Sequence, residues 1–122
     1  MPQVASETPG VSASALLDLA VDAWKFARLF ERIVSKLDAG EQNRYLNQMR
    51  FFQRRVDAAV EAANARLVSI EGTRFEPGIA ATPLNLSDFD PSDELYVDQM
   101  LEPIVMGSEG VLRMGTIMLR KL

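Results

Sequence analysis

Apolar residues in the first part of the chain recur at the alternating three- and four-residue spacing that places side chains on one face of a helix. Between Ser12 and Leu37 there is neither Gly nor Pro, so nothing in this stretch interrupts a helix. The apolar positions are Leu16, Leu19, Ala20, Ala23, Phe26, Ala27, Phe30, Ile33, Val34 and Leu37. A helix with such a face must bury it against another element, which limits the folds open to the chain.

A second apolar stripe follows in a shifted register. Its positions are Tyr45, Met49, Phe52, Val56, Ala59, Ala63 and Ile70. Extending the first register from Leu37 by seven residues predicts apolar residues at 44 and 51 instead of 45 and 52. At the slip, Asp38 and Glu41 stand three residues apart, as in a capping box with Asp as the N-cap. We favour two helices in an αα-hairpin over one long helix with a local irregularity.

The two stripes carry more aromatic surface than one hairpin can bury. These aromatic residues are Trp24, Phe26, Phe30, Phe51 and Phe52. Two hairpins from two chains would cover them in a four-helix bundle, and the alanines of the second stripe would let helices approach closely. We expect a homodimer whose interface contains Trp24, Phe30, Met49, Phe52, Val56, Ala59 and Ala63. The alternative is a monomer in which the second half of the chain covers the same side chains.

The chain contains no cysteine and no histidine, which excludes several kinds of chemistry. Disulfides, thiolate nucleophiles, Ser-His-Asp triads, imidazole acid–base catalysis and Cys/His zinc sites each need one of these residues. Catalysis would have to rest on carboxylates, Lys, Tyr or backbone groups. We therefore expect a binding or assembly protein that uses no cofactor and is not an enzyme.

Charge and hydropathy bear on partners and location. The net charge of −4 lies entirely in residues 74–122, which hold eight acids and four bases, and an acidic chain disfavours nucleic acid and anionic membranes. No apolar run approaches the roughly 18 residues of a membrane span. The first ten residues, "MPQVASETPG", lack the basic start and apolar middle of a signal peptide. We expect residues 1–11 to form a disordered tail and the protein to be cytoplasmic.

The helical pattern ends at "EGTRFEPG". Gly72 suits a helix C-terminal stop, and residues 77–78, Pro-Gly, suit a turn. Residues 79–86 form a short apolar run, which Pro83 restricts to an edge strand.

An acidic segment follows this run. Residues 90–93, "DPSD", are typical of a helix start and predict a short helix over about residues 91–101. A calcium loop counted from Asp88 fails, because position six is Asp93, where Gly is needed, and position twelve is Gln99, where Glu is needed. We expect no metal site here, and paired carboxylates for glycosidase-type chemistry are a weaker interpretation than a solvated acidic loop.

The chain closes with "EPIVMGSEGVLRMGTIMLRKL". Residues 104–106 favour a strand, residues 107–110 a turn and residues 111–119 a second strand. Gly115 inside the second strand indicates a bulge or the close approach of another backbone. Because two strands alone are marginally stable, the hairpin needs residues 79–86 as a third strand or the helices beneath it.

The sequence thus predicts an α+β fold. A helical dimerisation region, either a hairpin or a long helix, spans residues 12–71. A small β-rich module over residues 72–122 follows it and ends in a hairpin.

This order of elements resembles the GrpE family of nucleotide-exchange factors for DnaK-type chaperones. Residues 72–77, "GTRFEP", are similar to the G-x-x-F-[DE]-P segment that leads into the family's β module. Residues 111–119, "VLRMGTIML", are similar to its closing strand, V-L-R-P-A-x-V-x-V, and match directly at the first three positions. Met114 replaces the family's Pro, and no His-Glu-Ala follows Pro77. The resemblance covers roughly residues 40–120.

The resemblance implies dimerisation through a coiled coil and a four-helix bundle. It also implies a β module that docks on the chaperone's nucleotide-binding domain and wedges its cleft open, a task that needs no catalytic residue. The expected partner-binding residues are Phe75, Glu76, Pro77, Met106 and Arg113. The alternative is a structural or adaptor protein that oligomerises through its helices and binds another protein.

Arg113 has two interpretations. If Leu112 and Met114 face the helices, strand alternation turns Arg113 toward solvent, where its guanidinium can contact a partner carboxylate. In the other interpretation, Arg113 pairs with Glu102 or Glu109 across the hairpin and protects its edge.

Overall fold

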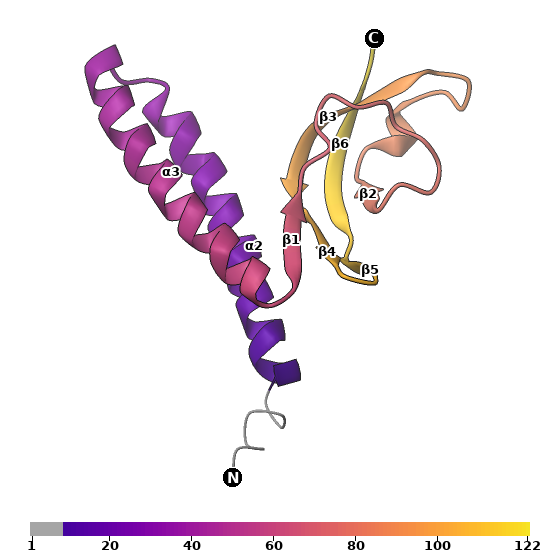
Figure 1. Cartoon of the computed structure of the whole chain (residues 1–122). Helices are drawn as coiled ribbons and strands as arrows, with labels where there is room; N and C mark the ends of the chain where they lie inside the picture. Colours follow the sequence, from indigo (N-terminus) through magenta and orange to yellow (C-terminus); the bar gives the residue numbers. More distant parts are fainter. Residues whose placement is uncertain (1–8) are drawn as a thin grey trace. The chain divides into compact units, whose positions relative to one another are not determined.

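The computed structural model describes the backbone of residues 9–122 and the side chains of residues 13–122. The chain divides after Asn64 into a helical unit and a β module. Helices α2 (Pro9–Val34) and α3 (Ala39–Ala62) form the first, and six short strands form the second (Figure 1). The predicted α+β class is confirmed. Helix α2 begins at Pro9, inside the tail predicted over residues 1–11, and the rest of that tail lies outside the described residues.

A capped turn separates the two helices. The backbone N–H of Glu41 donates to Asp38 Oδ1 at 3.0 Å, so Asp38 is the N-cap of α3. Gln42 Nε2 donates to the carbonyl oxygen of Leu37 at 2.6 Å, which satisfies a backbone acceptor beyond the end of α2. These bonds confirm the αα-hairpin and its cap. The hydrogen bonds from Glu41, the backbone one first, hold the pKa of the Asp38 carboxyl below its ordinary value.

Within the helical unit, α2 and α3 pack against each other along one stripe of each helix. The buried apolar residues of this unit are Leu17, Ala20, Trp24, Ala27, Val34 and Val60. The Phe30 ring meets the Tyr45 ring edge-on, with 6.4 Å between their centroids. The described core of this unit is therefore small, and it uses only part of the apolar residues that the helices carry.

Helix α3 ends earlier than predicted. Asn64 has a φ of 61°, in the left-handed region that Asn tolerates, and its N–H donates to the Glu61 carbonyl at 2.9 Å. Strand β1 (Ala65–Val68) follows at once and pairs with β4. The prediction of a helical region as far as residue 71, with Ile70 on its stripe, is therefore wrong. Gly72, predicted as the helix stop, instead has a φ of 83° in a turn.

The β module contains two three-stranded sheets. One has the order β1-β4-β5, with β4 (Ile104–Gly107) and β5 (Gly110–Arg113) forming an antiparallel hairpin. The other has the order β2-β6-β3, and its strands are β2 (Ala81–Pro83), β6 (Gly115–Lys121) and β3 (Leu95–Glu102). Strand β2 lies at an edge, as Pro83 requires, and runs parallel to β6. The turn predicted over residues 107–110 is confirmed. The single strand predicted over residues 111–119 is instead two strands, β5 and β6, which belong to different sheets.

The segment predicted as a helix over residues 91–101 is strand β3, and that prediction is wrong. The capping bonds do form, because Asp90 Oδ1 accepts from the Ser92 N–H at 3.0 Å and Asp93 Oδ2 accepts from the Asp90 N–H at 2.9 Å. They close an isolated turn that no helix extends.

Burial explains why β3 is a strand. Leu95 and Val97 alternate toward the inside of the module, and Val97 is 0% exposed. The pairing of β3 with β6 shifts register between Val97 and Gln99, which returns Met100 to the inside at 3% exposure. A strand therefore buries three large side chains in this segment.

Gly115 lies where three groups of the β module meet. A Cβ there would lie 2.8 Å from Met100 Cε and 3.0 Å from both the Glu102 carbonyl oxygen and Ile104 Cγ1. The predicted close approach of another backbone is confirmed.

Replacement by alanine should have opposite effects at Gly115 and at Gly40. Gly115→Ala should destabilise the β module by about 1–3 kcal/mol, because the backbone at Glu102 must move. Gly40→Ala in the first turn of α3 should stabilise the helical unit by about 0.5–1 kcal/mol, because its Cβ would lie 3.6 Å from the nearest atom, Asp38 Oδ1. Urea unfolding followed by circular dichroism, with amide hydrogen exchange of β6, measures both changes. A Gly115→Ala variant with the same free energy of unfolding as wild type would contradict the packing described.

The Asp38 cap predicts a pH dependence. A carboxyl whose pKa is lowered in the folded state stabilises that state above its unfolded pKa of about 3.9, and the stabilisation disappears as the pH falls through the folded value. Asp38→Ala should therefore lower the melting temperature at pH 6, and the difference from wild type should shrink below pH 3. Asp57→Ala, which removes a carboxylate from the C-terminal half of α3, is the control. An equal difference at both pH values would show that the cap is not ionic.

Candidate protein-binding surfaces

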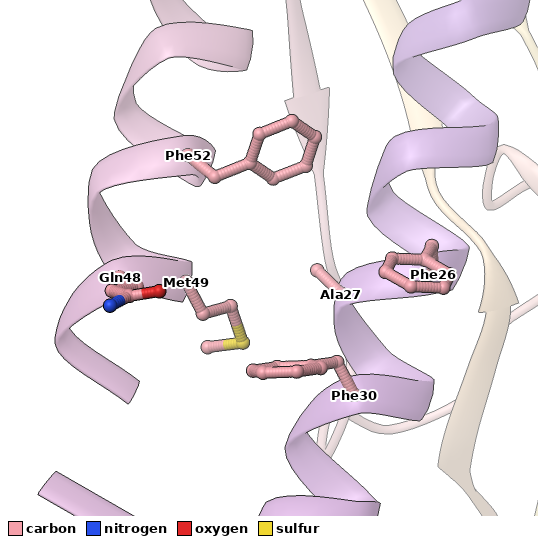
Figure 2. A pocket seen from close by; sticks show the side chains of 6 residues that line it. All are labelled: Phe26, Ala27, Phe30, Gln48, Met49 and Phe52. Carbon is pink, nitrogen blue, oxygen red and sulfur yellow. The ribbon is translucent and has the colours of Figure 1, made fainter. Parts of the chain in front are cut away.

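The helical unit carries an apolar groove along the seam between its helices. One hollow of about 220 Å³ is lined by Phe26, Ala27, Phe30, Gln48, Met49 and Phe52. An adjoining hollow of about 270 Å³ is lined by Leu16, Leu19, Ala20, Ala23, Phe52, Arg55, Val56 and Ala59. Phe52 belongs to both hollows, and together they are called the seam groove. Figure 2 shows the Phe30, Met49 and Phe52 side chains directed into the space between the helices.

The seam groove leaves large apolar side chains in water. Leu19 is 66% exposed, Phe26 is 62% exposed and Phe52 is 44% exposed. Only Gln48 and Arg55 among its lining residues are polar. Exposed apolar side chains gathered in one groove mark an interaction surface, since full burial of one such side chain stabilises by about 1.5–3 kcal/mol.

Most residues predicted at the dimer interface line the seam groove. They are Phe30, Met49, Phe52, Val56 and Ala59. Ala63 is not among the lining residues, because α3 has ended and Ala63 is its C-cap. Trp24 is a correction: the single chain already buries it to 8% exposure, with the Arg28 guanidinium 4.9 Å from its ring centroid. It therefore offers little surface to a second copy.

The β module has a hollow of its own. It begins where residues 72–75 lie along strand β3. The Gly72 N–H donates to the Val97 carbonyl at 2.8 Å, and the Phe75 N–H donates to the Leu95 carbonyl at 2.9 Å. The residues that line the resulting space of about 450 Å³ are Arg74, Phe75, Pro77, Leu86, Ser87, Phe89, Asp90, Pro91, Asp93, Glu94 and Leu95. We name it the β-module hollow.

An amide side chain holds one wall of this hollow in place. Asn85 Nδ2 donates to the Leu119 carbonyl at 2.9 Å, and the Leu119 N–H donates to Asn85 Oδ1 at 2.8 Å. The pair continues the hydrogen bonding of β2 beyond Pro83, which cannot donate. It fixes the short 3-10 helix η1 (Leu86–Asp88) against β6, and nothing in the sequence alone predicts it.

Of the predicted partner-binding residues, Phe75 and Pro77 line the β-module hollow, and Glu76 is exposed between them. Met106 and Arg113 lie instead on the β4–β5 hairpin, and both are half-buried. The structure therefore does not gather these residues into one pocket.

The condition set for a solvent-facing Arg113, that Leu112 and Met114 face inward, does not hold. Leu112 and Met114 are the exposed residues, at 54% and 52%. Arg113 is opposite Val105 of β4, which is fully buried, and so Arg113 is partly covered. Leu112 instead lies over the backbone of Gly107, with its Cγ 2.9 Å from the place a Cβ would take there.

Among the residues that the structure describes, no group of three or more acidic side chains is placed to hold a metal ion. No helix in the described part of the chain has both the length and the apolar character needed to cross a membrane. No protein-family model, curated protein or solved structure matches the chain.

Neighbouring phenylalanines give a direct test of the seam groove. Phe52→Glu should abolish self-association, because it places a charge in the groove, whereas Phe51→Glu, at a side chain that is 56% exposed and lines neither hollow, should not. Sedimentation velocity at micromolar concentration should give a dimer of the 13.5 kDa chain for wild type and Phe51→Glu, and a folded monomer for Phe52→Glu. The same oligomeric state for both variants would refute the assignment of the seam groove as the dimer interface.

Proposed function

We propose that the protein is a non-enzymatic, GrpE-like protein-binding factor that promotes nucleotide exchange on a DnaK-type chaperone. The supporting observation is the order of its elements: a helical hairpin with an uncovered apolar groove, followed directly by a two-sheet β module with a hairpin near its end. This order matches the one that the resemblance of residues 72–77 and 111–119 implies.

In this proposal the helical unit makes the dimer. Two hairpins that face each other through their seam grooves form a four-helix bundle and remove Leu19, Phe26 and Phe52 from water. Because Leu19 and Phe26 are already about one-third covered and Phe52 is about half covered, each contributes on the order of 1 kcal/mol. The alanines Ala20, Ala23 and Ala59 in the groove allow the second pair of helices to approach closely.

The β module makes the contact with the partner. A factor that opens a nucleotide cleft must bind the open form of its partner more tightly than the closed form, and it needs a rigid surface for this. The module has a packed interior, in which Val97, Val105 and Ile117 are fully buried. DnaK-type chaperones act in the cytoplasm, and we propose that location for this protein.

An adaptor function is the second candidate. An adaptor would form the same dimer as a nucleotide-exchange factor and would differ only in the protein that it binds. The residue that favours it is Met114, which is 52% exposed at the position where the GrpE-like closing strand has Pro. A hairpin surface altered there fits a different partner protein.

Release of a fluorescent ADP analogue from the DnaK-type chaperone of the same host tests the proposal. The wild-type protein should accelerate release. Glu76→Lys, at an exposed residue, should raise the concentration required by about 10–100-fold, as expected for loss of a charge-assisted contact. Arg66→Ala, at an exposed residue of β1, is the control. No acceleration with any such chaperone of the host would exclude nucleotide exchange and leave the adaptor function.

A further inference from the structure

The β-module hollow has the size and the floor of a peptide-binding site. Its volume of about 450 Å³ falls within the range of roughly 300–1,000 Å³ that is usual for ligand sites. The apolar side chains that line it are Phe75, Pro77, Leu86, Phe89, Pro91 and Leu95. Leu95 is buried, Phe75 and Phe89 are half-buried, and Leu86 is 46% exposed. An apolar side chain placed here would therefore meet two aromatic rings and two aliphatic side chains.

The rim of the hollow is acidic. Between Arg74 and Leu95 the sequence has five acids and one base, a charge of −4, whereas the rest of the chain has 12 acids and 12 bases. The net charge of the whole protein is thus concentrated in the segment that forms the hollow. Asp90, Asp93 and Glu94 line it directly. Such a rim attracts cationic groups and repels anionic ones.

Hydrogen bonds fix two of the carboxylates before any partner binds. The N–H and Oγ of Ser92 donate to Asp90 Oδ1 at 3.0 and 2.9 Å, and the Asp90 N–H donates to Asp93 Oδ2 at 2.9 Å. The bonds from Ser92 hold the pKa of Asp90 below its ordinary value, so this carboxylate is ionised at neutral pH.

Two cations of the chain itself lie near the rim and compensate it only in part. Arg74 Nη1 lies 3.4 Å from Glu94 Oε1, and Lys121 Nζ lies 3.7 Å from Asp93 Oδ1. Both cationic side chains are more than half exposed, and ion pairs of this kind stabilise by only about 0–1 kcal/mol. A cation of a partner can therefore replace either one at little cost.

We propose that the β-module hollow binds a short extended segment of a partner protein, which inserts an apolar side chain between Phe75 and Phe89 and presents Lys or Arg to the acidic rim. This inference rests on the proposed function in that the ligand is a protein, and it adds the chemistry of the segment that is recognised. The chain's own first eight residues, "MPQVASET", have one acid and no Lys or Arg, so charge does not favour them as the occupant.

Two pools of fluorescein-labelled peptides test the inference by fluorescence anisotropy with the full chain. Each peptide has a central Leu or Phe, flanked by Lys and Arg in one pool and by Glu in the other. The basic pool should bind at least about tenfold more tightly, a difference of about 1.4 kcal/mol, and its affinity should fall as salt is added.

Matched variants locate the binding. Leu86→Ser should weaken binding of the basic pool by about tenfold. Leu84→Ser, two residues earlier, 60% exposed and outside the hollow, should not. Asp88→Lys, beside the rim, should weaken binding, whereas Glu109→Lys makes the same change of charge in the β4–β5 turn and should not. The Asp88 variant keeps the test valid if Leu86→Ser does not fold.

Three results would overturn the inference. The first is failure of either comparison: the two pools bind equally or not at all, or Leu84→Ser and Leu86→Ser weaken binding of the basic pool equally. The second is binding that appears only after residues 1–8 are removed, which would assign the hollow to the chain itself. The third is association beyond a dimer at low salt that Leu86→Ser abolishes, which would place a second copy there. Failure here with normal nucleotide exchange would refute this inference alone, whereas failed exchange with normal peptide binding would refute only the chaperone partner.

Discussion

Two helices that lie side by side can bury only one stripe of each, and both helices of this chain carry a wider apolar face than that. The buried residues of the helical unit include Ala20, Ala27 and Val60, while Leu19 and Phe26 remain mostly exposed and Phe52 is 44% exposed. The excess cannot be removed by repacking the same two helices, because the exposed side chains border the seam that the helices already share. Because of this limit on burial, we propose that a second copy of the chain covers the exposed side chains.

The β module solves its own packing within 58 residues, from Ala65 to Leu122. Gly115 lets strand β6 pass close to Glu102, and the shift of register between Val97 and Gln99 of β3 keeps Met100 inside. The Asn85 amide then satisfies the backbone N–H and carbonyl of Leu119 on β6, and the Thr116 hydroxyl donates to Glu102 Oε1 at 2.9 Å, a bond between side chains of β6 and β3. Acids and bases balance over the rest of the chain, so the net charge lies in the segment between Arg74 and Leu95, where we propose that a partner binds.

Spacing of residues was sufficient to predict the helical hairpin, because the slip of the apolar register and the Asp38–Glu41 pair are local signals. The same kind of local signal misled at residues 90–93, where the capping bonds form but burial of Leu95, Val97 and Met100 in a sheet decides the structure. Helix α3 ends before Asn64, which adopts a left-handed conformation, and strand β1, which follows, pairs with β4 about 40 residues later in the chain, a long-range contact that local spacing does not reveal.

For the candidate sites, the apolar stripe identified most of the seam groove, since Phe30, Met49, Phe52, Val56 and Ala59 all line it. It could not show that Trp24 is buried within the single chain. Of the residues that line the β-module hollow, the sequence predicted only Phe75 and Pro77. The other walls come from residues that are brought together by β3 and by the Asn85 amide.

We propose that a second copy of the chain covers the seam groove. An isotope-filtered NOE experiment on a mixture of ¹³C-labelled and unlabelled protein tests it most directly. The account predicts intermolecular NOEs from the Met49 methyl group of the labelled copy to aromatic protons of the unlabelled one. A spectrum in which Met49 shows contacts to aromatic rings of its own chain and none to a second copy would contradict it.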